Sequence, residues 1–241
     1  MSASLELVKL KRTGFTAAFA GCALISAVVP VVNMAVRAEN YVDLPGNAFQ
    51  IMADSNWQMM ALFNILMIIL GACIIYHTEF ADNGIQKMRV LPVNEGIMYL
   101  GKFAVITVAL AVMVILETAS LALCAAHWFP SYEPDIGALA LSGAFQFVVT
   151  LPTAAVMLLI ASAYKNMWVS LGTGVILVFT LMIMPQDNAV LSLLPFSSPY
   201  QLLSNAQANE REWLFAGVCA AETAVFAAGE FAYLKVRRVL E

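Results

Sequence analysis

The chain has 241 residues, of which 61% are hydrophobic and 12% are charged, with a formal net charge of −4 and a mean hydropathy of +0.82. Soluble domains carry about 25% charged residues, and this chain has apolar runs longer than about 18 residues, so a soluble globular protein is excluded. Neither a metal site nor a disulfide framework is indicated, because no paired spacing relates the four cysteines, which all lie in apolar runs: Cys22, Cys73, Cys124 and Cys219. We expect one all-α integral membrane domain over residues 1–241.

Residues 1–12 are predicted to form an interfacial helix, because Lys9, Lys11 and Arg12 can contact anionic head groups. The first span, about 13–36, carries no charge. It is longer than the apolar region of a signal peptide, about 7–15 residues, and lacks a clean small-x-small cleavage site, so we expect it to be retained. The first outer loop is expected over 37–56, followed by the second span over about 57–76.

Residues 77–102 form the long polar interruption between hydrophobic runs that carries Lys and Arg. Asp82 is a suitable N-cap for a short helix that places Ile85, Met88 and Leu91 on one side. Pro92 ends this helix, since proline has no N–H to donate and its ring clashes with the preceding turn. The pattern suits a cytoplasmic coupling helix that receives a push from a partner, and an ordinary solvated loop fits it equally well.

The rest of the chain is predicted to contain four more spans, over about 103–127, 136–163, 167–185 and 213–234. The outer loop over 186–212 has an apolar centre that Pro195 and Pro199 interrupt. This centre is too short to cross a bilayer, so we expect a broken hairpin that is re-entrant or interfacial.

The basic residues sort by side of the membrane. Ten fall on the side that holds both chain ends: Lys9, Lys11, Arg12, Lys87, Arg89, Lys102, Lys165, Lys235, Arg237 and Arg238. Only Arg37 and Arg211 fall opposite. Six spans put both termini on one side, and the positive-inside rule predicts that this side is the cytoplasm. The tryptophans agree, because all four lie at predicted span ends, where aromatic belts form: Trp57, Trp128, Trp168 and Trp213.

The outer side is predicted to be acidic, because its acidic residues outnumber its two arginines. These acidic residues are Glu39, Asp43, Asp54, Glu133, Asp135, Asp187, Glu210 and Glu212. Clustered acids draw cationic peptides toward a surface because their fields add. The plainer interpretation, which we favour, is that outer loops avoid Lys and Arg for the sake of topology.

Glu117 and Glu222 fall near the predicted midplane, where a charge costs about 3 kcal/mol on insertion scales. No Lys or Arg lies at matching depth, so we expect protonation or hydrogen bonds to groups such as Asn64, Thr118 or Gln146. The residues of a candidate substrate, cation or proton pathway are therefore Glu117, Glu222, Asn64 and Gln146. A satisfied interhelical hydrogen bond is the alternative for each, and it is the interpretation we favour.

The sixth predicted span carries small residues at four-residue spacing: Ala216, Ala220, Ala224 and Ala228. Such spacing allows close helix approach, either within the chain or between subunits. Glu230 on the same span is expected to pair with Lys235 or Arg237 near the inner interface.

Motifs for nucleotide and covalent chemistry are absent from the sequence. It has no G-x-x-x-x-G-K-[ST] loop, no G-x-G-x-x-G turn, no metal-spaced histidines and no nucleophile elbow. We therefore expect no catalysis and no cofactor on this chain. If ATP is used, a partner must bind it.

The order of these parts resembles the permease subunit of ABC type-2 exporters. Residues 6–12, ELVKLKR, are similar to the E-x-x-K-x-K-R opening of lantibiotic-immunity permeases of the LanE/LanG group. Glu79 to Gly84, Lys87, Leu91 to Val93 and Gly101 to Phe103 resemble the coupling region of that group. The sequence EFADNG at 79–84 differs from the E-R-E-x-G-T pattern of many other exporters.

This resemblance implies an ATP-driven exporter located in a bacterial cytoplasmic membrane. The exporter is expected to clear a cationic, lantibiotic-like peptide from that membrane and to bind no nucleic acid. Two permeases, identical or paired with a similar sister, join two soluble ATPase subunits that hold ATP and Mg²⁺. The residues expected to contact the ATPase are Asp82, Ile85, Lys87, Met88, Arg89 and Leu91. The alternatives are an ion-coupled secondary carrier that uses Glu117 and Glu222, and a membrane scaffold that transports nothing.

Overall fold

The computed structural model describes residues 10, 13–80, 95–130, 132–183 and 188–240, and all regular elements among them are helices. These elements are α2 (Phe15–Arg37), η1 (Ala38–Asn40), α3 (Ala48–Phe80), α5 (Glu95–Trp128), α6 (Ile136–Ala163), α7 (Met167–Met182), α8 (Ala189–Ser192), η3 (Ser198–Tyr200), α9 (Leu203–Ala208) and α10 (Glu212–Leu240). Among these residues, five helices are long and apolar enough to cross a membrane, namely α2, α3, α5, α6 and α10. The chain is an integral membrane protein.

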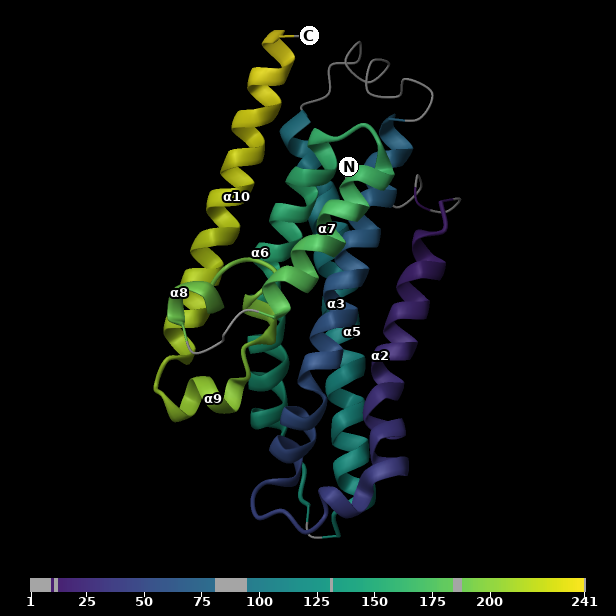
Figure 1. Cartoon of the computed structure of the whole chain (residues 1–241), viewed down its shortest axis with the longest axis vertical. Coiled ribbons are helices and arrows are strands. Elements are labelled where there is room, and N and C mark those ends of the chain that lie inside the picture. The colour runs from purple at the N-terminus through teal and green to yellow at the C-terminus, as the bar shows by residue number, and fades with distance from the viewer. Residues whose placement is uncertain (1–9, 11–12, 81–94, 131, 184–187, 241) are drawn as a thin grey trace.

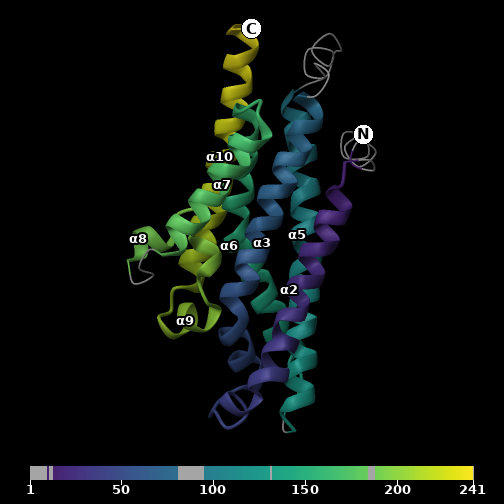
Figure 2. The same ribbon diagram turned by 45° about the vertical axis from the view of Figure 1, so that its right-hand side comes forward.

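Helix α3 is the centre of the bundle and packs against α2, α5, α6 and α7. Its sequence is apolar all round for most of its length, as expected for a helix with protein on several sides, and Met60, Ile65 and Ile68 are fully buried. Helix α10 packs mainly along α6, at the edge of the bundle. Figures 1 and 2 show α2, α3, α5 and α6 side by side, with α7 and α10 on the α6 side.

One end of the bundle collects the segments predicted to be cytoplasmic. The start of α2, the end of α3, the start of α5, the turn between α6 and α7 and the end of α10 all lie at the upper end of Figure 1. This arrangement matches an even number of passes. Which side of the membrane this end faces stays a prediction from charge.

The structure corrects the predicted loop over 37–56. Helix α3 begins at Ala48, where the Asn47 side chain accepts a hydrogen bond from the Phe49 N–H at 2.9 Å. Non-helical backbone is therefore confined to about 41–47. The prediction failed because the first nine residues of α3 mix apolar and polar types, which obscures the apolar run.

Helix α7 is shorter than the predicted fifth span, because it ends at Met182 rather than near residue 185. Its 16 residues extend about 24 Å at 1.5 Å per residue, less than the roughly 30 Å hydrocarbon core. The sixth crossing therefore stays a prediction.

The segment after α7 reaches the middle of α6. Phe196 has a left-handed φ of 68°, which is uncommon for a residue other than glycine, and its N–H donates to Thr153 Oγ1 at 3.0 Å. The Ser198 hydroxyl donates to the Val149 carbonyl at 2.7 Å, and the Trp57 indole N–H donates to the Pro199 carbonyl at 2.9 Å. The described part of this segment, 188–211, thus consists of the short helices α8, η3 and α9, while the outer hairpin and its depth in a bilayer stay predictions.

The predicted interfacial helix at 1–12 lies outside the described residues, except for Leu10. The Leu10 side chain is buried in the apolar core of the bundle. The Thr13 hydroxyl donates to the Leu10 carbonyl at 3.0 Å.

Candidate functional site

A buried polar cluster joins four helices in the middle of the bundle. We call it the Glu117 cluster, and its members are Ser26 of α2, Asn64 of α3, Glu117 of α5 and Gln146 of α6. The Asn64 and Gln146 side-chain amides each donate to Glu117 Oε2 at 2.9 Å, and the Ser26 hydroxyl donates to Oε1. All four side chains are at most 2% exposed. The two amide partners expected from the sequence therefore do contact Glu117.

Close helix packing places these groups within hydrogen-bonding reach. Gly143 lies one turn before Gln146 on α6, and a Cβ atom there would come within 3.2 Å of Thr118 Oγ1 on α5. Thr118 itself donates to the Val114 carbonyl at 2.8 Å, within its own helix. Thr118 is therefore a packing neighbour in this region and not a partner of the Glu117 carboxyl.

The Glu117 carboxyl has three neutral partners, and no cation among the described residues contacts it. A buried carboxyl with neutral donors can bind a proton or a small cation, or it can simply join helices. The geometry is compatible with both roles that the sequence left open.

Glu222, the fourth candidate pathway residue, is not part of this cluster. It lies on α10 and is half-buried, and its Oε2 atom has no hydrogen-bond partner among the described residues. The structure thus joins Glu117, Asn64 and Gln146 and leaves Glu222 apart from them.

A second polar cluster lies toward the end of the bundle where α3 ends and α5 begins. Lys102 Nζ of α5 lies 2.7 Å from Glu79 Oε1 of α3, and the two side chains are only 2% and 5% exposed. The same ammonium lies 5.2 Å from the ring centroid of Tyr76, which is within cation–π range. We call this group, with Ser162 and Glu230, the Lys102 cluster.

Glu230 extends this cluster to two further helices. The Tyr76 hydroxyl donates to Glu230 Oε1 at 3.3 Å, and the Ser162 hydroxyl donates to Oε2 at 3.0 Å. Glu230 of α10 is fully buried. Its expected pairing with Lys235 or Arg237 concerns side chains outside the described set. The cluster therefore connects α3, α5, α6 and α10.

Sequence reasoning missed the Glu79–Lys102 ion pair. Lys102 was interpreted through its contribution to topology and through the family resemblance, and Glu79 only through that resemblance. The available signal was that a carboxylate and an ammonium flank one connection between two helices expected to be antiparallel neighbours. A buried charge needs a partner, so this signal predicts an ion pair if both groups are assigned to helix interiors.

The predicted ATPase contacts lie outside the described residues: Asp82, Ile85, Lys87, Met88, Arg89 and Leu91. The structure describes the two helices that flank this segment, since α3 ends at Phe80 and α5 begins at Glu95. The Glu79–Lys102 pair lies on these two helices, close to where the segment joins them.

Two of the predicted outer acids have structural partners. The Asp135 carboxylate caps α6 by accepting hydrogen bonds from two backbone N–H groups, at 2.8 and 3.3 Å, and Asp54 accepts from the Ser204 hydroxyl at 2.7 Å. Asp187 lies outside the described residues. Four of the other acids are exposed: Glu39, Asp43, Glu133 and Glu210.

The small-residue stripe of α10 points mostly away from its own chain. Ala220, Ala224 and Ala228 are exposed, and a Cβ added to the neighbouring Gly217 would meet nothing within 4 Å among the described atoms. Packing within this chain therefore does not account for most of the stripe.

Comparison with known proteins places the chain in a family. The model described as ABC-2 family transporter protein matches residues 3–181, well over half of the chain. Neither the curated proteins nor the solved structures give a match. The matched range contains the whole Glu117 cluster and the Glu79–Lys102 pair, while α10 lies beyond it. The chain belongs to the ABC-2 family of transporter proteins.

Proposed function

We propose that the chain is the permease subunit of an ATP-binding cassette exporter. The family match carries this proposal, because an ABC-2 permease is a membrane transport component that works with an ATPase subunit. ATP and Mg²⁺ are held by that separate soluble subunit. The chain contributes the membrane passage and the contact that receives the mechanical work.

The geometry of the Lys102 cluster supports this role. The segment over 81–94 would dock on the ATPase, and a displacement there would act on α3 and α5. The buried Glu79–Lys102 pair joins these two helices, and separating the pair would leave an uncompensated buried charge. A push on the segment therefore moves both helices together, and Glu230 passes the movement to α10.

A second permease completes the proposed transporter. The exposed small residues of α10 offer a face on which another helix can approach closely. That second permease is either an identical copy of the chain or a similar sister chain. Two ATPase subunits would then serve the two coupling segments.

The proposed substrate is a cationic, membrane-active peptide of the lantibiotic type, expelled across a bacterial cytoplasmic membrane. The exposed acids Glu39, Asp43, Glu133 and Glu210 support this choice, since clustered negative charge concentrates cationic ligands. The resemblance of 6–12 and 79–103 to lantibiotic-immunity permeases points to the same substrate class.

Co-purification tests the proposal. The chain is tagged in its own bacterium, extracted in a mild detergent and isolated with its bound partners. We expect an ATPase with a phosphate-binding loop to be retained in a fixed ratio to the permease. A chain that purifies alone and exports its substrate without ATP would overturn the proposal.

The Glu117 cluster favours one competing function, an ion-coupled carrier. A carrier of that kind stops when an ionophore collapses the proton gradient, whereas an ATP-driven exporter continues as long as ATP is supplied. Measuring peptide efflux from membrane vesicles under these two conditions separates the two functions. If neither driving force yields efflux of any substrate, a scaffold role is favoured instead.

A further inference from the structure

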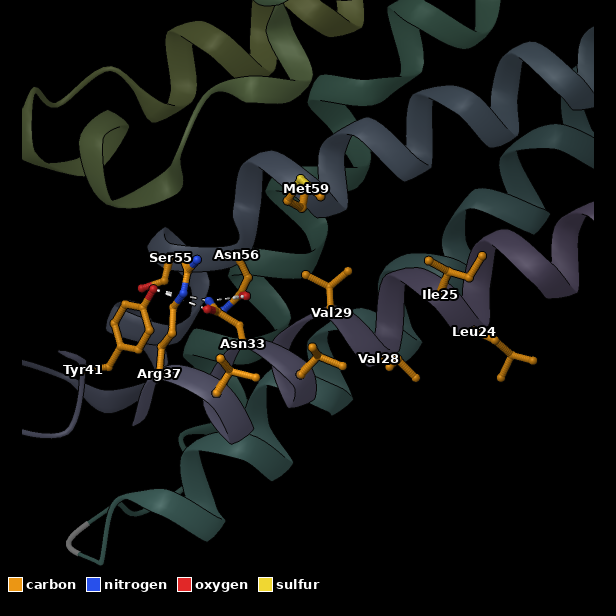
Figure 3. Close-up of a pocket in the computed structure, with 12 residues that line it drawn as sticks. Leu24, Ile25, Val28, Val29, Asn33, Arg37, Tyr41, Ser55, Asn56 and Met59 are labelled. Atoms are coloured by element: carbon orange, nitrogen blue, oxygen red, sulfur yellow. Dashed lines mark hydrogen bonds between the residues drawn. The ribbon is translucent and has the colours of Figure 1, made fainter. Parts of the chain in front are cut away.

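A groove of about 660 Å³ lies between α2 and α3, near the end of the bundle that carries η1. Its lining combines an apolar stretch of α2 with polar side chains at one end: Leu24, Ile25, Val28, Val29, Val32, Asn33, Val36, Arg37, Tyr41, Ser55, Asn56 and Met59. Figure 3 shows Asn33, Arg37, Tyr41, Ser55 and Asn56 gathered at that end, with Val28, Ile25 and Leu24 further along α2.

The apolar stretch has the length of one membrane leaflet. The groove follows α2 from Leu24 to Val36, which is about 18 Å at 1.5 Å per residue. Half of a typical hydrocarbon core is about 15 Å. Val28 and Val32 are 49% and 54% exposed, so this part of the groove presents apolar surface that the chain itself leaves uncovered.

The polar end is already organised by hydrogen bonds. The Asn33 side-chain amide donates to Asn56 Oδ1 at 3.0 Å, and the Asn56 amide donates to the Met52 carbonyl at 2.8 Å. Asn56 is only 1% exposed. The Tyr41 hydroxyl lies 3.4 Å from Asn33 Nδ2. These hydrogen bonds fix the positions of the polar side chains at this end of the groove.

Arg37 supplies the charge at this end. It is the only charged residue in the groove lining, its side chain is exposed, and no hydrogen bond or ion pair among the described residues uses its guanidinium. In the proposed topology only one other basic residue, Arg211, lies on this side of the membrane. Within the described part of the chain, the groove therefore ends in a cation without an ion-pair partner.

We propose that this groove binds one phospholipid with an anionic head group. The guanidinium of Arg37 takes the phosphate, for which its planar fork of donors is well suited, and the acyl chain lies along Val28 and Val32. The exposed acids Glu39 and Asp43 lie outside the lining, so within the groove itself Arg37 disfavours a cationic peptide. In the proposed topology the lipid comes from the outer leaflet. The site is independent of the ATPase and of the exported substrate.

The test measures lipid binding to the full-length chain in detergent by native mass spectrometry. The probes are phosphatidylglycerol and phosphatidylcholine with identical acyl chains. We expect one retained phosphatidylglycerol, bound more tightly than phosphatidylcholine. Arg37→Gln should weaken phosphatidylglycerol binding about tenfold, as expected for loss of one charged hydrogen-bonding partner. The matched control is Arg211→Gln, which removes the exposed arginine that does not line the groove.

A second pair of variants tests the acyl-chain position. Val32→Trp fills the apolar stretch and should reduce the binding of both lipids, whereas Leu123→Trp changes a 71% exposed position on α5 outside the groove and should not. Thermal unfolding of each variant shows whether it is folded. Equal binding of the two lipids, or equal losses in variants and controls, would overturn the proposal. Capture of a second copy of the chain by a photo-crosslinker at Val32 would also overturn it and would assign the groove to a subunit contact.

Discussion

The two buried polar clusters differ in how their charges are compensated. In the Glu117 cluster, one carboxyl accepts hydrogen bonds from a hydroxyl and two amides, all of them neutral. In the Lys102 cluster, an ammonium lies 2.7 Å from the carboxylate of Glu79, and a second carboxyl, of Glu230, lies nearby through Tyr76. The middle of the bundle is thus joined by neutral hydrogen bonds, and the end beside 81–94 by charge.

The energetic scales of the two clusters differ accordingly. Interhelical hydrogen bonds in membranes contribute about 0.6 kcal/mol each, with a maximum near 1.7. Removing one partner of a buried ion pair costs about 3–5 kcal/mol. The middle of the bundle can therefore exchange partners at modest cost, while α3 and α5 stay joined at the end. A stiff end and an adaptable middle are what the proposed joint movement of α3 and α5 requires.

Loss of Lys102 should have the largest effect on stability. Lys102→Met removes the ammonium that faces the buried Glu79 carboxylate, and we expect a destabilisation of about 3 kcal/mol or more. Thermal unfolding of the purified chain in detergent measures it. Lys165→Met is the matched control, because Lys165 is exposed in the turn between α6 and α7. Equal melting of the two variants would show that the ion pair contributes no stability.

Substitutions of Glu117 should have an intermediate effect on stability, whose size depends on whether the new side chain can form hydrogen bonds. Glu117→Leu leaves the amides of Asn64 and Gln146 without their acceptor, and we expect a loss of about 2 kcal/mol. Glu117→Gln keeps hydrogen-bonding capacity and should cost less than about 1 kcal/mol. Unfolding measurements on both variants give this ranking.

The same Glu117 variants separate two functions. In an ATP-driven exporter, Glu117→Gln should retain most of the peptide efflux, because the helices stay joined. In an ion-coupled carrier the same change should abolish transport, because the glutamine amide cannot take up and release a proton near neutral pH as a carboxyl can. Complete loss of efflux in a folded Glu117→Gln variant would contradict the exporter account of this cluster.

Substitution of Glu222 should have the smallest effect on stability and on transport. Its Oε2 atom has no described partner, so Glu222→Gln breaks no hydrogen bond seen in the structure. We expect a stability change within about 0.5 kcal/mol and unchanged transport. A large loss of either would indicate that Glu222 contacts a second subunit or the substrate.

The sequence predicted the parts of the fold that depend on local composition. The apolar runs predicted the long helices, and polar residues inside such runs identified Glu117 together with Asn64 and Gln146. A lone carboxyl at mid-span needs partners, and few are available at that depth, which is why this inference succeeded. The start of α3 was missed because Asp54 and Asn56 interrupt its apolar pattern.

Contacts between distant segments could not be predicted in the same way. The hydrogen bond from Trp57 to the Pro199 carbonyl joins residues 142 positions apart, and neither residue type indicates the other. The Glu79–Lys102 pair depends on the register between two antiparallel helices. The hydrogen bond between Asn33 and Asn56 likewise arises from the crossing of α2 and α3, which composition does not encode.

The most direct test of the central claim measures whether the segment 81–94 couples ATP hydrolysis to export. Wild-type chain, Met88→Asp and Leu91→Asp are each reconstituted with the ATPase, and hydrolysis and peptide efflux are measured on the same vesicles. The account predicts that both variants insert normally into the membrane. In both, ATP hydrolysis no longer drives peptide efflux. Efflux at the wild-type rate in both variants would contradict it.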